Sequence, residues 1–102
     1  MTLPLISLGG VGLISVAANE APAELTAFVR ACLENNRDES QRLNRELWAL
    51  MKANFIETSP GPVKAALALM GKIDETYRLP MVPVTPKTKE KLRAVLVDLK
   101  LL

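Results

Sequence analysis

Few side chains in this sequence are of the types that carry out covalent or acid–base chemistry. Cys32 is the only cysteine, and histidine is absent. The chain therefore has no intrachain disulfide, no histidine general base and none of the common zinc ligand sets. Cys32 falls on the apolar side of an expected helix with no histidine to activate it, so we interpret it as a packed structural cysteine. We expect no catalytic residue, metal site or cofactor in this chain.

Lysine is the remaining nucleophile, and it attacks carbonyl compounds only as a free amine. A lysine that does so needs burial in a site that lowers its pKa. Every lysine falls on an expected helix or at a helix end, and none falls on an expected strand: Lys52, Lys64, Lys72, Lys87, Lys89, Lys91 and Lys100. We expect none of them to form a Schiff base in this chain alone.

Two further patterns could indicate anion binding. Gly9, Gly10 and Gly12 suggest a phosphate loop, but phosphate-binding glycines follow a strand and open a helix, whereas these precede an expected strand. We interpret them as a tight helix-to-strand turn. Basic residues recur at every second position near the C-terminus, which scatters charge around a helix and favours a solvated face. They are Lys87, Lys89, Lys91 and Arg93.

The carboxylates and large apolar residues also have structural interpretations. Several acidic residues fall in expected first turns of helices, where negative charge complements the helix dipole. They are Glu20, Glu24, Asp38 and Glu39. Trp48, Met51 and Phe55 recur at helical spacing, and we expect them to pack between helices rather than to bind a ligand.

Composition places the chain among soluble globular proteins. It has 102 residues, of which 49% are hydrophobic and 24% charged, which suits one small domain. The net charge of +2 and the 4% aromatic content disfavour nucleic-acid binding. The apolar N-terminus has no basic leader and is interrupted by Pro4 and glycines, so neither a signal peptide nor a spanning helix is expected. We expect a cytoplasmic protein that binds no membrane.

One segment has the pattern of a strand buried on both faces of a parallel sheet. Val11–Val16 is short, apolar and β-branched, with glycines before it and Asn19 after it. No second strand is recognisable. Because unpaired backbone groups are costly to bury, we expect the partner strands to lie outside these residues.

The rest of the chain predicts a mainly α-helical protein. A helix starts at Pro22 and ends at Asn35-Asn36, with an apolar stripe formed by Leu25, Phe28, Val29, Cys32 and Leu33. Asn36 and Glu39 match a capping box for a second helix that runs to about Glu57. The inward residues of that helix are Leu43, Leu47, Leu50, Met51 and Phe55.

Two more helices are expected. Ser59 can cap a third helix that places Val63, Ala66, Leu67 and Met70 inward and stops at Gly71. Residues 78–84 cannot be helical because their prolines force extended backbone. Thr85 then caps and Pro86 opens the last helix, whose inner face holds Leu92, Val95, Leu96 and Leu99.

Several separated blocks resemble one family in the correct order. They are Leu3-Pro4, Leu8–Val16 with Asn19, Phe55-Ile56-Glu57, Pro62–Leu67 with Gly71, Arg78–Met81 with Pro83, and Leu101-Leu102. On these blocks the chain resembles the C-terminal third of the dihydrodipicolinate synthase family, which also includes N-acetylneuraminate lyase. The Arg-Leu-Pro linker and the Pro-Val-Lys helix favour the synthase branch. Ser59–Pro62 departs from that branch's usual Asn-Pro-Ile-Pro.

The resemblance implies the last β/α unit of a (β/α)8 TIM barrel and a C-terminal three-helix extension. Residues 1–35 would hold the end of the seventh helix, the eighth strand and the eighth helix, and residues 36–102 the extension. The implied enzyme condenses pyruvate with aspartate semialdehyde through a lysine Schiff base in lysine and diaminopimelate biosynthesis. Its catalytic lysine, tyrosine and threonines lie in segments that these residues do not include. Only the substrate-binding isoleucine carries over, to Ile14, which would shape the pyruvate pocket.

Three hypotheses about function remain open. The first is a C-terminal segment of a pyruvate-dependent lyase that is inactive alone, and the second is one half of a split enzyme. The third is an independent helical module without enzymatic activity that self-associates. Without the barrel, we expect the stripe of Leu25, Phe28 and Val29 to be uncovered, and such apolar helix faces to form a homo-oligomer.

Overall fold

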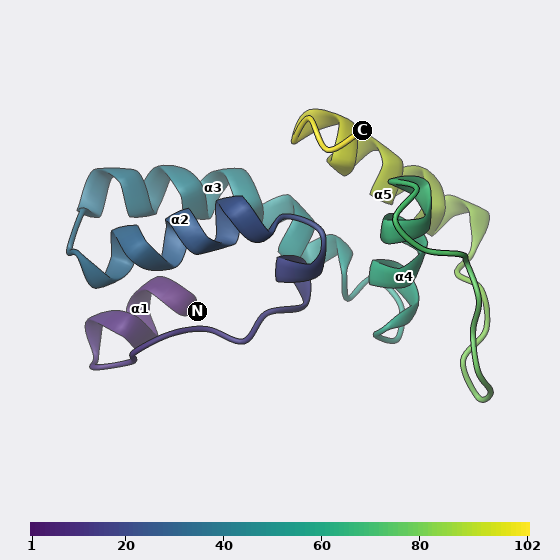
Figure 1. Ribbon diagram of the computed structural model, residues 1–102, viewed down its shortest axis with the longest axis horizontal. Coiled ribbons are helices and arrows are strands. Elements are labelled where there is room, and N and C mark those ends of the chain that lie inside the picture. The colour runs from purple at the N-terminus through teal and green to yellow at the C-terminus, as the bar shows by residue number, and fades with distance from the viewer.

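The computed structural model describes residues 1–102 as helices joined by loops, and Figure 1 shows their order in space. The elements are α1 (Thr2–Ser7), the 3-10 helix η1 (Val16–Asn19), α2 (Pro22–Leu33), α3 (Arg37–Ala53), α4 (Gly61–Leu69) and α5 (Pro86–Asp98). The prediction of a mainly α-helical chain is confirmed.

The expected strand over Val11–Val16 does not form. Residues 10–15 cross from α1 to η1 as a loop beside α2 (Figure 1), and no N–H group of residues 11–15 donates to a backbone acceptor. The strand prediction was wrong for this chain because a strand needs a hydrogen-bonded neighbour, and no other segment supplies one. Ser15, with φ −134° and ψ 136°, keeps extended backbone.

α2 and α3 form an antiparallel helix pair, and α1 packs against both of them. Leu25, Phe28 and Cys32 of α2 are buried, as the apolar stripe predicts. Val29 is half-buried and Leu33 is exposed. On α3, the 3.6-residue period correctly places Leu43, Leu47 and Leu50 in the core.

Left-handed residues stop the helices where the sequence indicates. Asn35, with φ +55°, follows α2, and Gly71, with φ +69°, follows α4. At each stop, the N–H groups of the left-handed residue and of the residue after it donate to carbonyls near the end of the helix. For example, the Gly71 N–H donates to the Ala68 carbonyl and the Lys72 N–H to the Leu67 carbonyl. This bonding satisfies the carbonyls that a helix end leaves free.

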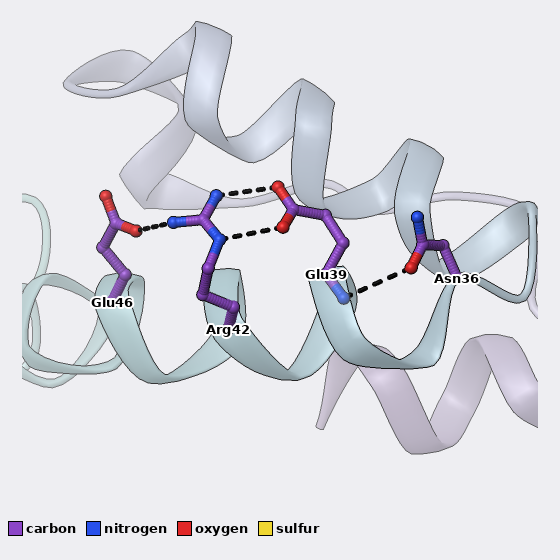
Figure 2. A network of polar contacts seen from close by, with 4 residues as sticks. All are labelled: Asn36, Glu39, Arg42 and Glu46. Atoms are coloured by element: carbon purple, nitrogen blue, oxygen red, sulfur yellow. Dashed lines mark hydrogen bonds and ion pairs between the residues drawn. The ribbon is translucent and has the colours of Figure 1, made fainter.

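Half of the predicted capping box at the start of α3 is present. The Asn36 side chain accepts a hydrogen bond from the Glu39 backbone N–H at 3.3 Å. The Glu39 carboxylate does not return to Asn36. As Figure 2 shows, it pairs with Arg42, which also contacts Glu46 at 2.6 Å. Hydrogen bonding to Arg42 lowers the pKa of Glu39.

α3 ends earlier than its apolar period predicts. It stops at Ala53 rather than near Glu57, and residues after Asn54 form tight turns. Phe55 therefore lies outside the helix and is 63% exposed, while Trp48 is 51% exposed on the outer face of α3. The prediction that both pack between helices was wrong, although Met51 does contact the core.

α4 starts one residue later than predicted. Its first residue is Gly61 and its N-cap is Pro60, with no side-chain cap, so the prediction of a Ser59 cap was wrong. The Gly61 N–H donates instead to the Thr58 carbonyl at 3.0 Å. Val63 and Ala66 are buried, while Leu67 and Met70 are half-buried.

α5 begins as predicted. The Thr85 hydroxyl accepts from the Thr88 N–H at 3.4 Å, and Pro86 occupies the first turn. Leu92 and Leu96 are buried, and Val95 and Leu99 pack against the core. The core is one cluster that includes residues from every helix. It therefore joins residues 1–35 to residues 36–102.

Candidate functional site

Ile14 is the one predicted binding residue, and its side chain is fully exposed. It lies on the 10–15 loop and lines a cavity of about 240 Å³ whose other wall is formed by Met51, Asn54 and Phe55. An exposed isoleucine beside an exposed phenylalanine forms an apolar surface that nothing in this chain covers.

Leu13 lines a different cavity. This second cavity, of about 490 Å³, lies over α2 and includes Pro22, Leu25 and Val29 among its walls. Adjacent residues of extended backbone point to opposite sides, so the separation of Leu13 and Ile14 is that of a strand. Leu13 and Ile14 thus face different cavities, whereas Ser15 lines both.

The α2 stripe is more covered than predicted. Leu25 and Phe28 are buried, and only Val29 is left partly exposed. The expectation that all three are uncovered was wrong, because α3 and α1 pack on α2 and supply its apolar contacts. The open part of this surface is the cavity beside Leu13.

The nucleophiles are placed as the sequence predicts. Cys32 is a free thiol in the core, and burial raises its pKa, which keeps it in the less reactive form. No lysine is buried: Lys64 and Lys89 are half-buried and the rest are exposed. The Lys64 ammonium lies 5.3 Å from the centre of the Tyr77 ring.

The basic run on α5 has one paired member. Lys89 forms an ion pair with Glu75, which also accepts a hydrogen bond from the Tyr77 hydroxyl at 3.2 Å. Burial, followed by the Glu75 charge, raises the pKa of Tyr77 to about 12. Lys87, Lys91 and Arg93 are exposed, which agrees with the prediction of a solvated face.

Glu20 and Asn54 form a contact that the sequence did not indicate. The Asn54 amide donates to the Glu20 carboxyl at 2.6 Å, and the two residues are 0% and 2% exposed, respectively. Glu20 was expected in the first turn of a helix, as Glu24 is, but it follows η1 and precedes Ala21, the N-cap of α2, so that expectation was wrong. The residues are 34 positions apart. No periodicity or short motif could have paired them.

The glycine run makes a turn. Gly9, with φ +104°, donates to the Ile6 carbonyl, and Gly10 donates to the Leu5 carbonyl, which closes the end of α1. No group of three or more histidine, cysteine, aspartate or glutamate side chains could hold a metal ion. None of the helices has the length and hydropathy needed to cross a membrane.

Comparison with known proteins gives a consistent match. The profile of the Dihydrodipicolinate synthetase family matches residues 1–99. The 4-hydroxy-tetrahydrodipicolinate synthase of Koribacter versatilis is 51% identical over 98 residues, which cover 96% of this chain and 33% of that protein.

Solved structures agree. A crystal structure of the dihydrodipicolinate synthase of Thermotoga maritima matches with a TM-score of 0.96 and 46% identity, over 99% of this chain and 34% of that one. The chloride-inhibited synthase of Acinetobacter baumannii complexed with pyruvate matches with a TM-score of 0.94 and 35% identity. The match covers 98% of this chain and 34% of that one.

The chain spans about a third of the length of the relatives that it matches, and the matched part is C-terminal. The family profile covers nearly all of the chain, and the helices superpose on those of solved synthases. The chain belongs to the dihydrodipicolinate synthetase family.

Proposed function

We propose that this chain supplies the closing part of a (β/α)8 barrel in an enzyme that condenses pyruvate with aspartate semialdehyde. Residues 1–35 would provide the eighth strand and its helix, and residues 36–102 the helical extension. The observation that carries the proposal is the 10–15 loop, where residues 11–14 make no backbone hydrogen bond and the adjacent Leu13 and Ile14 line different cavities. Neighbouring barrel strands would supply the missing hydrogen bonds.

Ile14 would form part of the wall of the pyruvate pocket. Its exposed side chain is available to a partner segment or a substrate, and its apolar surface suits the methyl end of pyruvate. An apolar wall also excludes water from a Schiff base, which water would hydrolyse. Ile14 has no group that transfers a proton, so its role would be to shape the pocket.

The chemistry would come from residues outside this chain. A Schiff-base lysine must be buried to lose its proton near neutral pH, and no lysine here is buried. We expect the chain alone to be inactive.

Borohydride trapping tests this division of roles. The chain is incubated with pyruvate and sodium borohydride, alone and with a polypeptide containing the first two-thirds of the Koribacter versatilis relative. Intact mass should stay unchanged for the chain in both mixtures, and the added polypeptide should gain one reduced pyruvate. A pyruvate adduct on the chain itself would overturn the assignment.

A further inference from the structure

The buried contact between Glu20 and Asn54 leaves two oxygen atoms without a partner. Asn54 Nδ2 donates to Glu20 Oε2, while Glu20 Oε1 and Asn54 Oδ1 accept nothing. Both atoms are hidden from solvent. A buried acceptor without a donor costs free energy, and an ionised carboxylate in such a place costs more.

One proton satisfies both oxygens. A protonated carboxyl group has one O–H donor, and an amide oxygen is an acceptor. When the acid O–H donates to the amide oxygen and the amide N–H donates to the acid carbonyl, the two groups form a planar pair with two hydrogen bonds. An ionised Glu20 could form only one of those bonds.

No charged side chain compensates for an ionised Glu20. η1, which Glu20 directly follows, packs against α2, α3 and α4. On α2, the charged residue nearest to Glu20 in the sequence is Glu24, and on α3 the one nearest to Asn54 is Lys52. The only charged residue on α4 is Lys64. None of them shifts the pKa of Glu20, which burial raises to about 7 against the opposing hydrogen bond from Asn54.

We propose that below neutral pH Glu20 is protonated in the folded chain and forms a neutral, two-bond acid–amide pair with Asn54, and that this pair is a pH-sensitive tie between the 1–35 segment and the end of α3. Asn54 also lines the cavity that contains Ile14. The tie therefore fixes the wall of that cavity, and it weakens when Glu20 ionises.

The sign of the pH dependence follows from proton linkage. The pKa of Glu20 is about 7 when folded, against a value of 4.5 for the unfolded group, so the folded chain binds more protons between these pH values. The Glu20 contribution to stability is fully present below pH 4.5 and is lost as the pH rises through 7. Above the folded pKa, the Glu20 carboxyl group causes no further change of stability with pH.

The test uses Glu20→Gln as an uncharged mimic of the protonated acid, since its amide can donate to Asn54 Oδ1. Glu24→Gln, in the first turn of α2, is the matched control. Urea unfolding is measured from pH 4 to 9 for the wild type and for Glu20→Gln. Across this range the folding equilibrium constant of the wild type should fall by roughly 300-fold relative to that of the variant, because each unit of pKa difference corresponds to a factor of about ten. Glu24→Gln should keep the wild-type pH profile.

Carbon-13 NMR of the Glu20 carboxyl group provides the second readout. We expect the carboxyl chemical shift to titrate with a midpoint near pH 7 in the wild type. In the Asn54→Leu variant, which lacks the amide, the midpoint should differ. Titration of wild-type Glu20 near pH 4.5 would overturn the proposal. So would a Glu20→Gln chain that fails to fold, or one that retains the wild-type pH profile.

Discussion

Leu13 and Ile14 are adjacent in the sequence but line different cavities, Leu13 over α2 and Ile14 beside the end of α3. Neighbouring side chains of a strand likewise point to opposite sides. Ile14 therefore faces the end of α3, whereas Leu13 lies beside α2. The arrangement leaves Ile14 exposed beside the end of α3, where a neighbouring segment could contact it.

The turn that precedes this segment depends on Gly10. A Cβ atom at Gly10 would lie 2.9 Å from the Leu5 carbonyl oxygen, whereas a Cβ atom at Gly12 would meet nothing within 4 Å. Gly10→Ala should therefore lower the free energy of unfolding by more than about 1 kcal/mol, because backbone must move. Gly12→Ala is the control and should change it by no more than about 0.5 kcal/mol. Urea denaturation measures the free energy of unfolding of both variants. Equal losses in the two variants would contradict the close approach of Gly10 to the Leu5 carbonyl oxygen.

Thr85 connects α5 to the segment before α4. Its N–H and hydroxyl both donate to Glu57, at 3.0 and 2.7 Å, and its hydroxyl also caps α5. Thr85→Ala should cost about 1 kcal/mol of stability, the usual loss for an N-cap. Thr58→Ala removes an exposed hydroxyl with no side-chain bond and should be nearly neutral. A Thr85→Ala chain with unchanged thermal stability would exclude the cap.

Glu57 should make stability depend on acid pH. Side-chain hydrogen bonds from Thr88 and Thr85 lower its pKa, so its contribution is present above the unfolded pKa of 4.5. The contribution is lost as the pH falls through the folded value. Glu57→Gln should flatten this part of the stability profile, and the effect should become smaller in a Thr85→Val background, which removes the Thr85 hydroxyl but keeps its backbone N–H and Thr88. A profile that Glu57→Gln leaves unchanged would show that the carboxylate has no such role.

The exposed apolar side chains predict self-association. Trp48 and Phe55 are more than half exposed, as is Val97 on α5. Exposed apolar patches commonly bind a partner. We expect light scattering to detect a dimer or larger assembly at high micromolar concentration, and Trp48→Ser with Phe55→Ser to weaken it. A stable monomer at that concentration would contradict this prediction.

Local signals in the sequence predicted most helix boundaries. Pro22, Asn36, Gly71 and Thr85 each act through their own backbone or a residue three positions away. The end of α3 was missed because a 3.6-residue period identifies a face and does not identify where a helix stops. The exposure of Phe55 follows from that error.

The candidate site was only partly predictable. Ile14 came from the family resemblance, and the structure adds the cavity that it shares with Asn54. The Glu20–Asn54 pair joins residues 34 positions apart, so its partners become neighbours only after the helices pack. Long-range polar contacts of this kind leave no periodic signal in one sequence.

The most direct test of the proposed function is the turnover of a chimeric enzyme. Residues 1–102 replace the matching C-terminal third of the Koribacter versatilis relative, and condensation of pyruvate with aspartate semialdehyde is measured. We expect an active chimera whose kcat/KM for pyruvate falls roughly tenfold or more with Ile14→Ala and hardly changes with the exposed control Val11→Ala. A chimera that folds but has no turnover would show that these residues do not complete the barrel of such an enzyme.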